Sequence, residues 1–177
     1  MKTLKDAIGA TAVRQIQRRI RSGKIKPSSN RKNFKGQKKT TLFDSGRLYR
    51  SITYKISGDK IIVGTNVKYA KIQQEGGVIK PKNKKWLTIP LTPAAKAKRA
   101  PDFSDTFAQF YTEDGKAYGI IFQKAEPEPI ALYKLVKRVN IPARPFLFLD
   151  DTDKEKIAGA ALDWLKLNIK KYADARR

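Results

Sequence analysis

Residues 42–77, LFDSGRLYRSITYKISGDKIIVGTNVKYAKIQQEGG, carry the signals that decide the fold. Asp44 and Ser45 can begin a short helix, because a side-chain oxygen there accepts hydrogen bonds from the free N–H groups of the first turn. The apolar residues of the 48–52 segment then give this helix one apolar face. The stretch therefore opens with a predicted helix.

The second part of the stretch changes to the period of two that is typical of a strand. Apolar and polar residues alternate over residues 52–56, Gly58-Asp59 predicts a tight turn, and residues 61–63 predict the return strand. Asn66 can cap a further helix that runs to Gln73, and Gly76-Gly77 can end it. The order helix, hairpin, helix follows.

Helical signals flank this stretch. Residues 3–21 carry apolar side chains at every fourth position, which predicts an amphipathic helix. Residues 22–41 are basic and nearly free of apolar anchors, so we expect a loop that is mobile in isolation. Near the C-terminus, Thr152 as N-cap and Glu155 as its capping-box partner predict a long final helix.

Strand signals fill the part between them. Residues 78–92 predict two strands joined by a basic hairpin tip, and residues 117–124 and 130–139 predict two more. Trp86 is interpreted as strand packing, in preference to a base-stacking site. Phe103, Phe107 and Phe110 have the spacing of one helical face, which predicts a local packing cluster.

These elements predict an α+β fold in which a single antiparallel sheet is covered by the N-terminal and C-terminal helices. The length fits one domain with a sizeable core. We expect a single domain over residues 1–177, divided into an N-terminal helix (1–21), a basic loop (22–41), the sheet with short helices and an insert (42–150), and a C-terminal helix (151–177).

Charge is the dominant feature of the composition. The chain has 39 Lys and Arg against 16 Asp and Glu, a formal net charge of +23. Acidic residues are almost absent from residues 1–40 and absent from residues 80–100, so a surface that faces DNA and a merely solubilising surface both fit. The cations expected to face DNA or a neighbouring subunit are Lys24, Lys26, Arg31, Lys32, Lys35, Lys38, Lys39, Lys80, Lys82, Lys84 and Lys85.

The composition also limits the chemistry. The chain has neither Cys nor His, which removes disulfides, thiolate chemistry, the usual general base and the usual metal ligand. Glycine-rich phosphate-binding motifs are absent. We expect no enzyme activity, no cofactor and no metal, although a magnesium nuclease could gather Asp44, Asp59 and Glu75. There is no apolar run of membrane-spanning length and no signal-peptide core, so we expect no membrane partner.

Five segments in this order resemble the virion-morphogenesis and tail-completion proteins of tailed bacteriophages: Asp44-Ser45-Gly46-x-Leu48, Ser51-Ile52, Val63-Gly64-Thr65, Tyr69-Ala70-x-Ile72-Gln73-Gln74-x-Gly76-Gly77 and Ile141-Pro142-Ala143-Arg144-Pro145-Phe146-Leu147. Gln73 stands where that family usually has His, which leaves a structural role open and excludes a titrating one. The motif residues that the resemblance marks as structural are Asp44, Gly46, Tyr69, Gln73, Gly76, Gly77, Pro142, Arg144, Pro145 and Phe146.

The last of these segments also has a physical interpretation of its own. Pro142 and Pro145 hold the backbone extended on both sides of Arg144, and the apolar residues 146–149 are predicted to enter the core. The guanidinium of Arg144 can offer a bidentate fork to a carboxylate or a carbonyl. An internal brace, for example to Asp44 or Glu75, and a contact across a subunit boundary are both open.

The resemblance implies a structural protein of the phage neck or tail that completes the tail or joins it to the head. Such a protein would assemble in the host cytoplasm as a ring around the DNA path and remain in the virion neck or tail. Its partners would be further copies of itself, other phage neck or tail proteins, and double-stranded DNA contacted without sequence preference. The alternative is a free, sequence-nonspecific DNA-binding protein, which explains the charge but not the motifs. The gene could belong to a phage or to a prophage.

Overall fold

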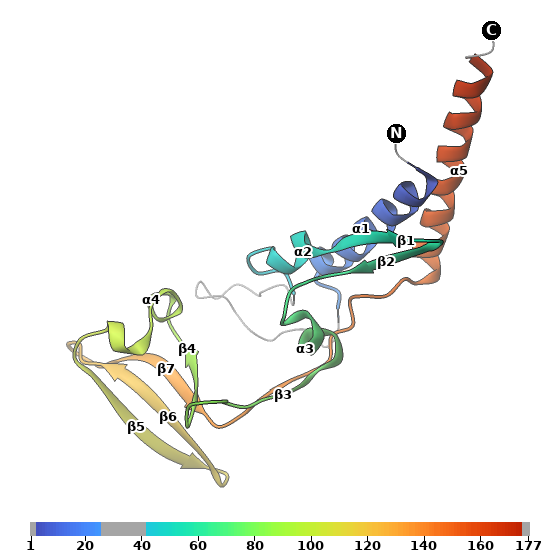
Figure 1. Cartoon of the computed structure of the whole chain (residues 1–177). Coiled ribbons are helices and arrows are strands. Elements are labelled where there is room, and N and C mark those ends of the chain that lie inside the picture. Colours follow the sequence, from blue (N-terminus) through green and yellow to red (C-terminus); the bar gives the residue numbers. More distant parts are fainter. Residues whose placement is uncertain (1–2, 26–41, 175–177) are drawn as a thin grey trace. The chain divides into compact units, whose positions relative to one another are not determined.

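The structure, a computed structural model, describes residues 3–25 and 42–174 (Figure 1). Their contacts divide them into two compact units. We call residues 3–25, 42–76 and 142–174 the helical unit, and residues 77–141 the sheet unit. The single domain predicted from the sequence is thus built from two units, and the chain passes between them at Gly76-Gly77 and at Ile141-Pro142.

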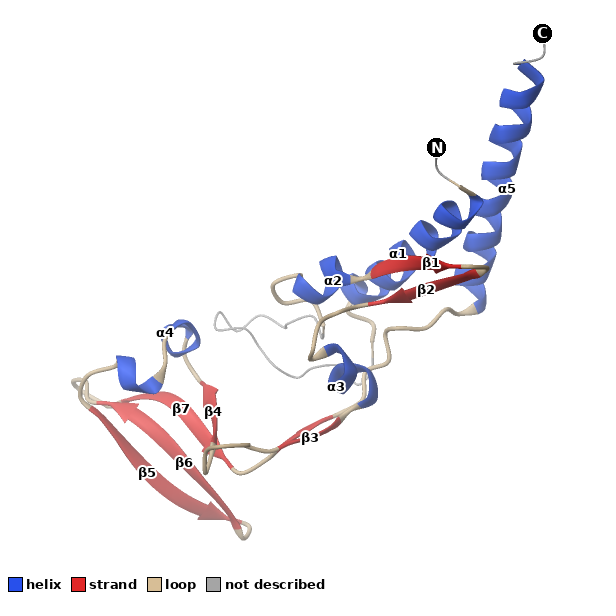
Figure 2. Ribbon diagram, viewed as in Figure 1, coloured by secondary structure: helices blue, strands red, loops and turns tan. Residues whose placement is uncertain are grey.

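The helical unit contains four helices and one hairpin among its described residues (Figure 2). Its elements are α1 (Leu4–Ser22), α2 (Arg47–Ser51), β1 (Thr53–Ser57), β2 (Lys60–Gly64), α3 (Ala70–Glu75) and α5 (Asp151–Asp174). The predicted order of helix, hairpin, helix over residues 42–77 is confirmed, as are both terminal helices. Thr3 caps α1 through a reciprocal capping box with Asp6.

The core of the helical unit joins segments that are far apart in the sequence. Ile16 and Ile20 of α1, Leu48 of α2 and Phe146 are each at most 2% exposed and belong to one apolar cluster. Phe146 thus brings the segment before α5 against α1 and α2. The predicted burial of residues 146–149 is only partly correct, because Leu147 is half-buried while Phe148 and Leu149 are exposed.

The β1–β2 hairpin packs its apolar face on α1. Tyr54 lies opposite Val63 and Ile56 opposite Ile61, so these four half-buried side chains share one face. The Tyr54 hydroxyl donates a hydrogen bond to Asp6 Oδ1 at 3.0 Å. The Tyr54 ring lies directly over Gly9, where an added Cβ would be 2.4 Å from the ring atom Cδ2. The glycine therefore permits the close approach of the hairpin to the helix.

Replacing Gly9 with alanine is expected to lower the free energy of unfolding by about 1–3 kcal/mol, because the new methyl overlaps the Tyr54 ring. Gly159→Ala in α5 is the matched control. Nothing lies within 4 Å of the Cβ position there, so alanine should raise stability by about 0.5–1 kcal/mol through helix propensity. Urea denaturation measures both. Equal stabilisation by the two substitutions would contradict the packing of Tyr54 on Gly9.

The sheet unit holds two of the three sheets that the described residues form. A four-stranded antiparallel sheet has the order β4-β7-β6-β5, and β3 pairs separately with β8. The elements are β3 (Gly77–Ile79), β4 (Leu87–Pro90), α4 (Pro93–Ala97), a 3₁₀ turn (Ala100–Asp102), β5 (Thr106–Glu113), β6 (Lys116–Gln123), β7 (Ile130–Val136) and β8 (Val139–Ile141).

The α+β class with antiparallel pairing and terminal helices is confirmed, but the single sheet is wrong. The strands after residue 86 bury their apolar residues with α4, through a cluster of Ala95, Leu132 and Tyr133. The β1–β2 hairpin buries its apolar face against α1. Each set of strands therefore packs against a helix of its own unit, and no hydrogen-bonded ladder joins the two sets among the described residues.

Two local predictions in the sheet unit are also wrong. Residues 80–85 are not a hairpin tip, because β3 pairs with β8 and β4 pairs with β7. Phe107 and Phe110 do not share a helical face, since they lie on opposite faces of strand β5. Their partners are cross-strand aromatics and Trp86: Phe107 stacks on Phe122, and Phe110 packs on Trp86, which confirms Trp86 as a strand-packing residue.

Three predicted helix caps lie at the wrong residue. Gly46, with φ of 75°, is the N-cap of α2 in place of Asp44 or Ser45. Helix α3 begins at Ala70, later than Asn66 predicts, and Thr65 holds the preceding turn by accepting from the Val67 N–H. The capping box of α5 is formed by Asp150 and Asp153, two residues before the predicted Thr152 and Glu155. The N-cap glycine of α2 has no side-chain acceptor, and Ser45 Oγ, one residue earlier, accepts from the Arg47 N–H at 3.4 Å, as predicted for a helix-start residue.

Candidate assembly interface

The two glutamines of α3 hold the proline-rich segment before α5. The backbone N–H of Arg144 donates to the carbonyl of Gln73 at 2.8 Å, and its side-chain Nη1 donates to Gln73 Oε1 at 3.3 Å. Gln74 Oε1 accepts from the N–H groups of Phe146 at 2.9 Å and Leu147 at 3.0 Å. Arg144 therefore braces the helical unit internally, and an amide at Gln73 supplies the acceptor without any titrating group.

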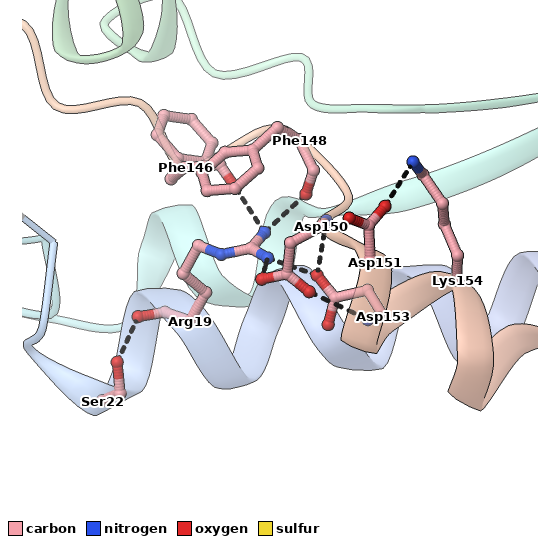
Figure 3. A network of polar contacts seen from close by, with 8 residues as sticks. All are labelled: Arg19, Ser22, Phe146, Phe148, Asp150, Asp151, Asp153 and Lys154. Carbon is pink, nitrogen blue, oxygen red and sulfur yellow. Dashed lines mark hydrogen bonds and ion pairs between the residues drawn. The ribbon is translucent and has the colours of Figure 1, made fainter.

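Arg19 is the centre of a polar network between α1, the segment that ends at Asp150, and the first turn of α5 (Figure 3). Its guanidinium donates to the carbonyls of Phe146 and Phe148, and to the carboxylates of Asp150 at 3.0 Å and Asp153. It also lies 3.8 Å from the centre of the Phe148 ring. The Arg19 side chain is 13% exposed and that of Asp153 only 8%, so this is a largely buried ion pair.

The stability that this network gives to the fold depends on the ionisation of Asp150, and therefore on pH. The Asp153 N–H, and then Arg19, hold the pKa of Asp150 below its ordinary value. A carboxyl whose pKa is lowered by folding stabilises the fold above its unfolded pKa of about 3.9, and that contribution is lost as the pH falls through the folded pKa. We expect the Tm to fall as the pH decreases below about 4, and the Asp150→Asn variant to show a shallower fall there. Parallel Tm profiles for the two proteins would contradict this role.

A basic cleft of about 840 Å³ opens beside this network. It is lined by Phe148, Pro145 and Ile25, by the network residues Arg19, Asp150 and Asp153, and by three further cations, Arg18, Lys24 and Lys156, so cations outnumber carboxylates in its lining. These three cations are exposed, and none makes an ion pair or side-chain hydrogen bond with another described residue. Lys24, predicted from the sequence to face a partner, therefore lies on a cationic concave surface of the helical unit.

The second predicted group of cations lies in a loop of the sheet unit. Lys80, Lys82, Lys84 and Lys85 are all exposed, in the segment between β3 and β4. The remaining predicted cations, Lys26, Arg31, Lys32, Lys35, Lys38 and Lys39, lie outside the described residues. Each unit thus carries a surface with unpaired positive charge, which suits phosphate or carboxylate partners.

The other motif residues have conformational roles. Gly46 and Gly76, with φ of 75° each, cap the start of α2 and the end of α3, and Gly77, with φ of 145°, begins β3. Asp44, Tyr69, Pro142 and Pro145 are exposed. Sequence reasoning did not single out Arg19, Asp153 or Gln74 as a group, because nothing in their spacing marks three residues that meet only in the folded chain.

The magnesium site considered from the sequence is not assembled among the described residues. No three of their carboxylates gather closely enough to hold a metal ion, so Asp44, Asp59 and Glu75 are not brought together as a cluster. Asp59 instead forms an exposed ion pair with Lys5 at 2.8 Å. Within the described part of the chain, no helix combines the length and the apolar character needed to cross a membrane.

Comparison with known families identifies the class of protein. Residues 1–101 match the phage virion morphogenesis family, a span that includes α1, the hairpin and the segment from Tyr69 to Gly77. The chain belongs to this family, as the motifs of residues 42–77 indicate, and its role lies in the assembly of the phage virion. Searches of curated proteins and of solved structures gave no significant match.

Proposed function

We propose that the chain is a structural protein of the phage neck or tail that completes the tail or joins it to the head. Family membership carries this proposal, since virion morphogenesis is an assembly role. In the proposed assembly, copies of the chain form a ring around the DNA path and contact other neck or tail proteins. The protein acts by binding and shape, so the proposal requires no reaction and no cofactor.

The exposed, unpaired lysines support the proposal that DNA passes through the ring. Lys80, Lys82, Lys84 and Lys85 are exposed and close together in the sequence, and the whole chain carries a net charge of +23. A duplex that passes through a ring presents phosphates regardless of its sequence, so exposed lysines without a base-reading element suit it. The same charge would also suit a free DNA-binding protein, which the test below separates from an assembly protein.

The first test changes the charge of the 80–85 loop in a phage that depends on this protein. Replacing Lys80, Lys82, Lys84 and Lys85 with glutamate should abolish the joining of tails to heads in electron micrographs, while the Tm of the purified protein stays unchanged. The matched control replaces the same four lysines with arginine, which keeps the charge and should keep joining. Full joining by the glutamate variant would refute the role of this loop.

The second test measures the solution mass by light scattering at low and moderate salt. A discrete ring-sized oligomer at both salt concentrations supports a neck or tail component. A monomer that binds bare duplex tightly at moderate salt would instead favour the free DNA-binding protein. Nonspecific affinity falls steeply as the salt concentration rises, so only a protein with many phosphate contacts stays bound tightly at moderate salt.

A further inference from the structure

Helix α5 carries an apolar stripe that no other described element covers. Leu162, Leu165 and Ile169 are 56%, 41% and 67% exposed, and the exposed Ala158 extends the row toward the start of the helix. We call these four residues the α5 seam. At 100° per residue they lie within about 60° of one another around the helix. Four neighbouring apolar positions on one face are too many to be scattered surface residues.

The seam is distinct from the face by which α5 joins its own unit. Helix α1 contacts α5, and the half-buried residues of α5 include Ile157, Ala161 and Trp164. Around the helix, Ile157 lies about 110°, Trp164 about 130° and Ala161 about 70° from the middle of the seam. Burial on α1 therefore accounts for one face of α5 and leaves the seam free. Figure 1 shows the last turns of α5 continuing past the start of α1.

The spacing of the seam points to another helix as its partner. Ala158, Leu162, Leu165 and Ile169 follow one another at intervals of four, three and four residues. This is the pattern of a coiled-coil seam, in which apolar side chains at alternating intervals insert between those of a facing helix. A sheet or a loop would not require this periodicity, so the fitting occupant is a helix with a similar apolar row.

The charge distribution of α5 favours a second copy of the same helix as the partner of the seam. Its 24 residues hold five acids and five lysines, so α5 is formally neutral in a chain of net charge +23. Residues 151–163 contain four of the acids and two lysines, whereas residues 164–174 contain three lysines and one acid. Two copies therefore meet along α5 without the repulsion expected elsewhere on the surface, and an antiparallel arrangement sets the acidic half of each against the basic half of the other.

We propose that α5 pairs with α5 of a second copy, antiparallel and through the seam. Leu162 then faces Leu165 of the partner, and Ala158 faces its Ile169. The contact is a closed two-fold one, in which each copy presents the same patch. This goes beyond the proposed ring, because a ring forms through a repeated head-to-tail contact on other surfaces, and the dimer requires no phage, head or tail component.

Light scattering on the full chain tests the pairing itself. We expect the native protein to contain an even number of copies, and the Leu165→Glu/Ile169→Glu variant to have half the native mass. Leu167→Glu is the control: Leu167 is 63% exposed but lies on the side of α5 opposite the seam. A monomeric native protein, an unchanged mass of the seam variant, or equal loss in the control overturns the proposal, whether or not the protein joins tails to heads.

The absence of cysteine allows the direction to be tested by disulfide trapping. A mixture of Ala158→Cys and Ile169→Cys chains should form a mixed disulfide, because the two positions face each other in the antiparallel pair. The Ile169→Cys chain alone should not, since its two sulfurs would be held about 16 Å apart along the helix axis, beyond disulfide reach. A strong disulfide from Ile169→Cys alone would show a parallel pair and refute the antiparallel arrangement.

Discussion

Replacing Phe146 with alanine is expected to lower the free energy of unfolding by about 3–5 kcal/mol. Phe146 is 1% exposed and contacts the cluster formed by Ile16 and Ile20 of α1 and Leu48 of α2. Its removal would leave a cavity where three segments of the helical unit meet, and close-packed surroundings fill such a cavity only in part. Urea denaturation followed by circular dichroism measures the loss.

Phe148→Ala is the matched control for this experiment. Phe148 has the same side chain two residues further on, but it is 45% exposed and its main described contact is the Arg19 guanidinium. Losing that contact should cost about 1 kcal/mol. If the two alanine variants unfold at the same urea concentration, Phe146 is not the residue that anchors the segment before α5.

The elements that could be predicted from the sequence are those that a single local periodicity specifies, wherever their packing partners lie. The amphipathic pattern of residues 3–21 and the alternation over residues 52–56 each depend on one periodicity, and both elements form as predicted. The burial of Phe146 is predicted correctly, but the same apolar run also predicts burial of Phe148 and Leu149, which are exposed. Pairing between distant strands is not predictable, since any two apolar strands satisfy the same pattern. The number of sheets therefore could not be read from the sequence.

Some features of the candidate interface could also be predicted from the sequence, and others could not. The exposure of Lys80, Lys82, Lys84 and Lys85 follows from a run of lysines, which cannot be buried without partners. The bonding of Gln74 to the backbone at Phe146 and Leu147 joins residues more than 70 positions apart, and no local rule predicts it. The sequence predicts that Arg144 bonds to a carboxylate or a carbonyl, and the amide carbonyl of Gln73 fulfils the second possibility, although neither the residue nor its helix could be named in advance.

A leucine at Arg19 is expected to lower the free energy of unfolding by about 3–5 kcal/mol. The substitution leaves the buried carboxylate of Asp153 and the carbonyls of Phe146 and Phe148 without their shared donor. An uncompensated buried charge costs more than the pair contributes, so most of the loss comes from the groups that remain. Arg18→Leu, one residue away and exposed, should change stability by less than about 0.5 kcal/mol.

A double variant identifies the origin of that loss. Asp153→Asn removes the buried negative charge while keeping an oxygen that can accept from the backbone at Asp150. Arg19→Leu/Asp153→Asn should therefore be more stable than Arg19→Leu alone, although the second substitution removes one more charged group. If the double variant is less stable than Arg19→Leu by the full cost of Asp153→Asn alone, the two residues act independently, and Arg19 contributes mainly through its stacking on Phe148.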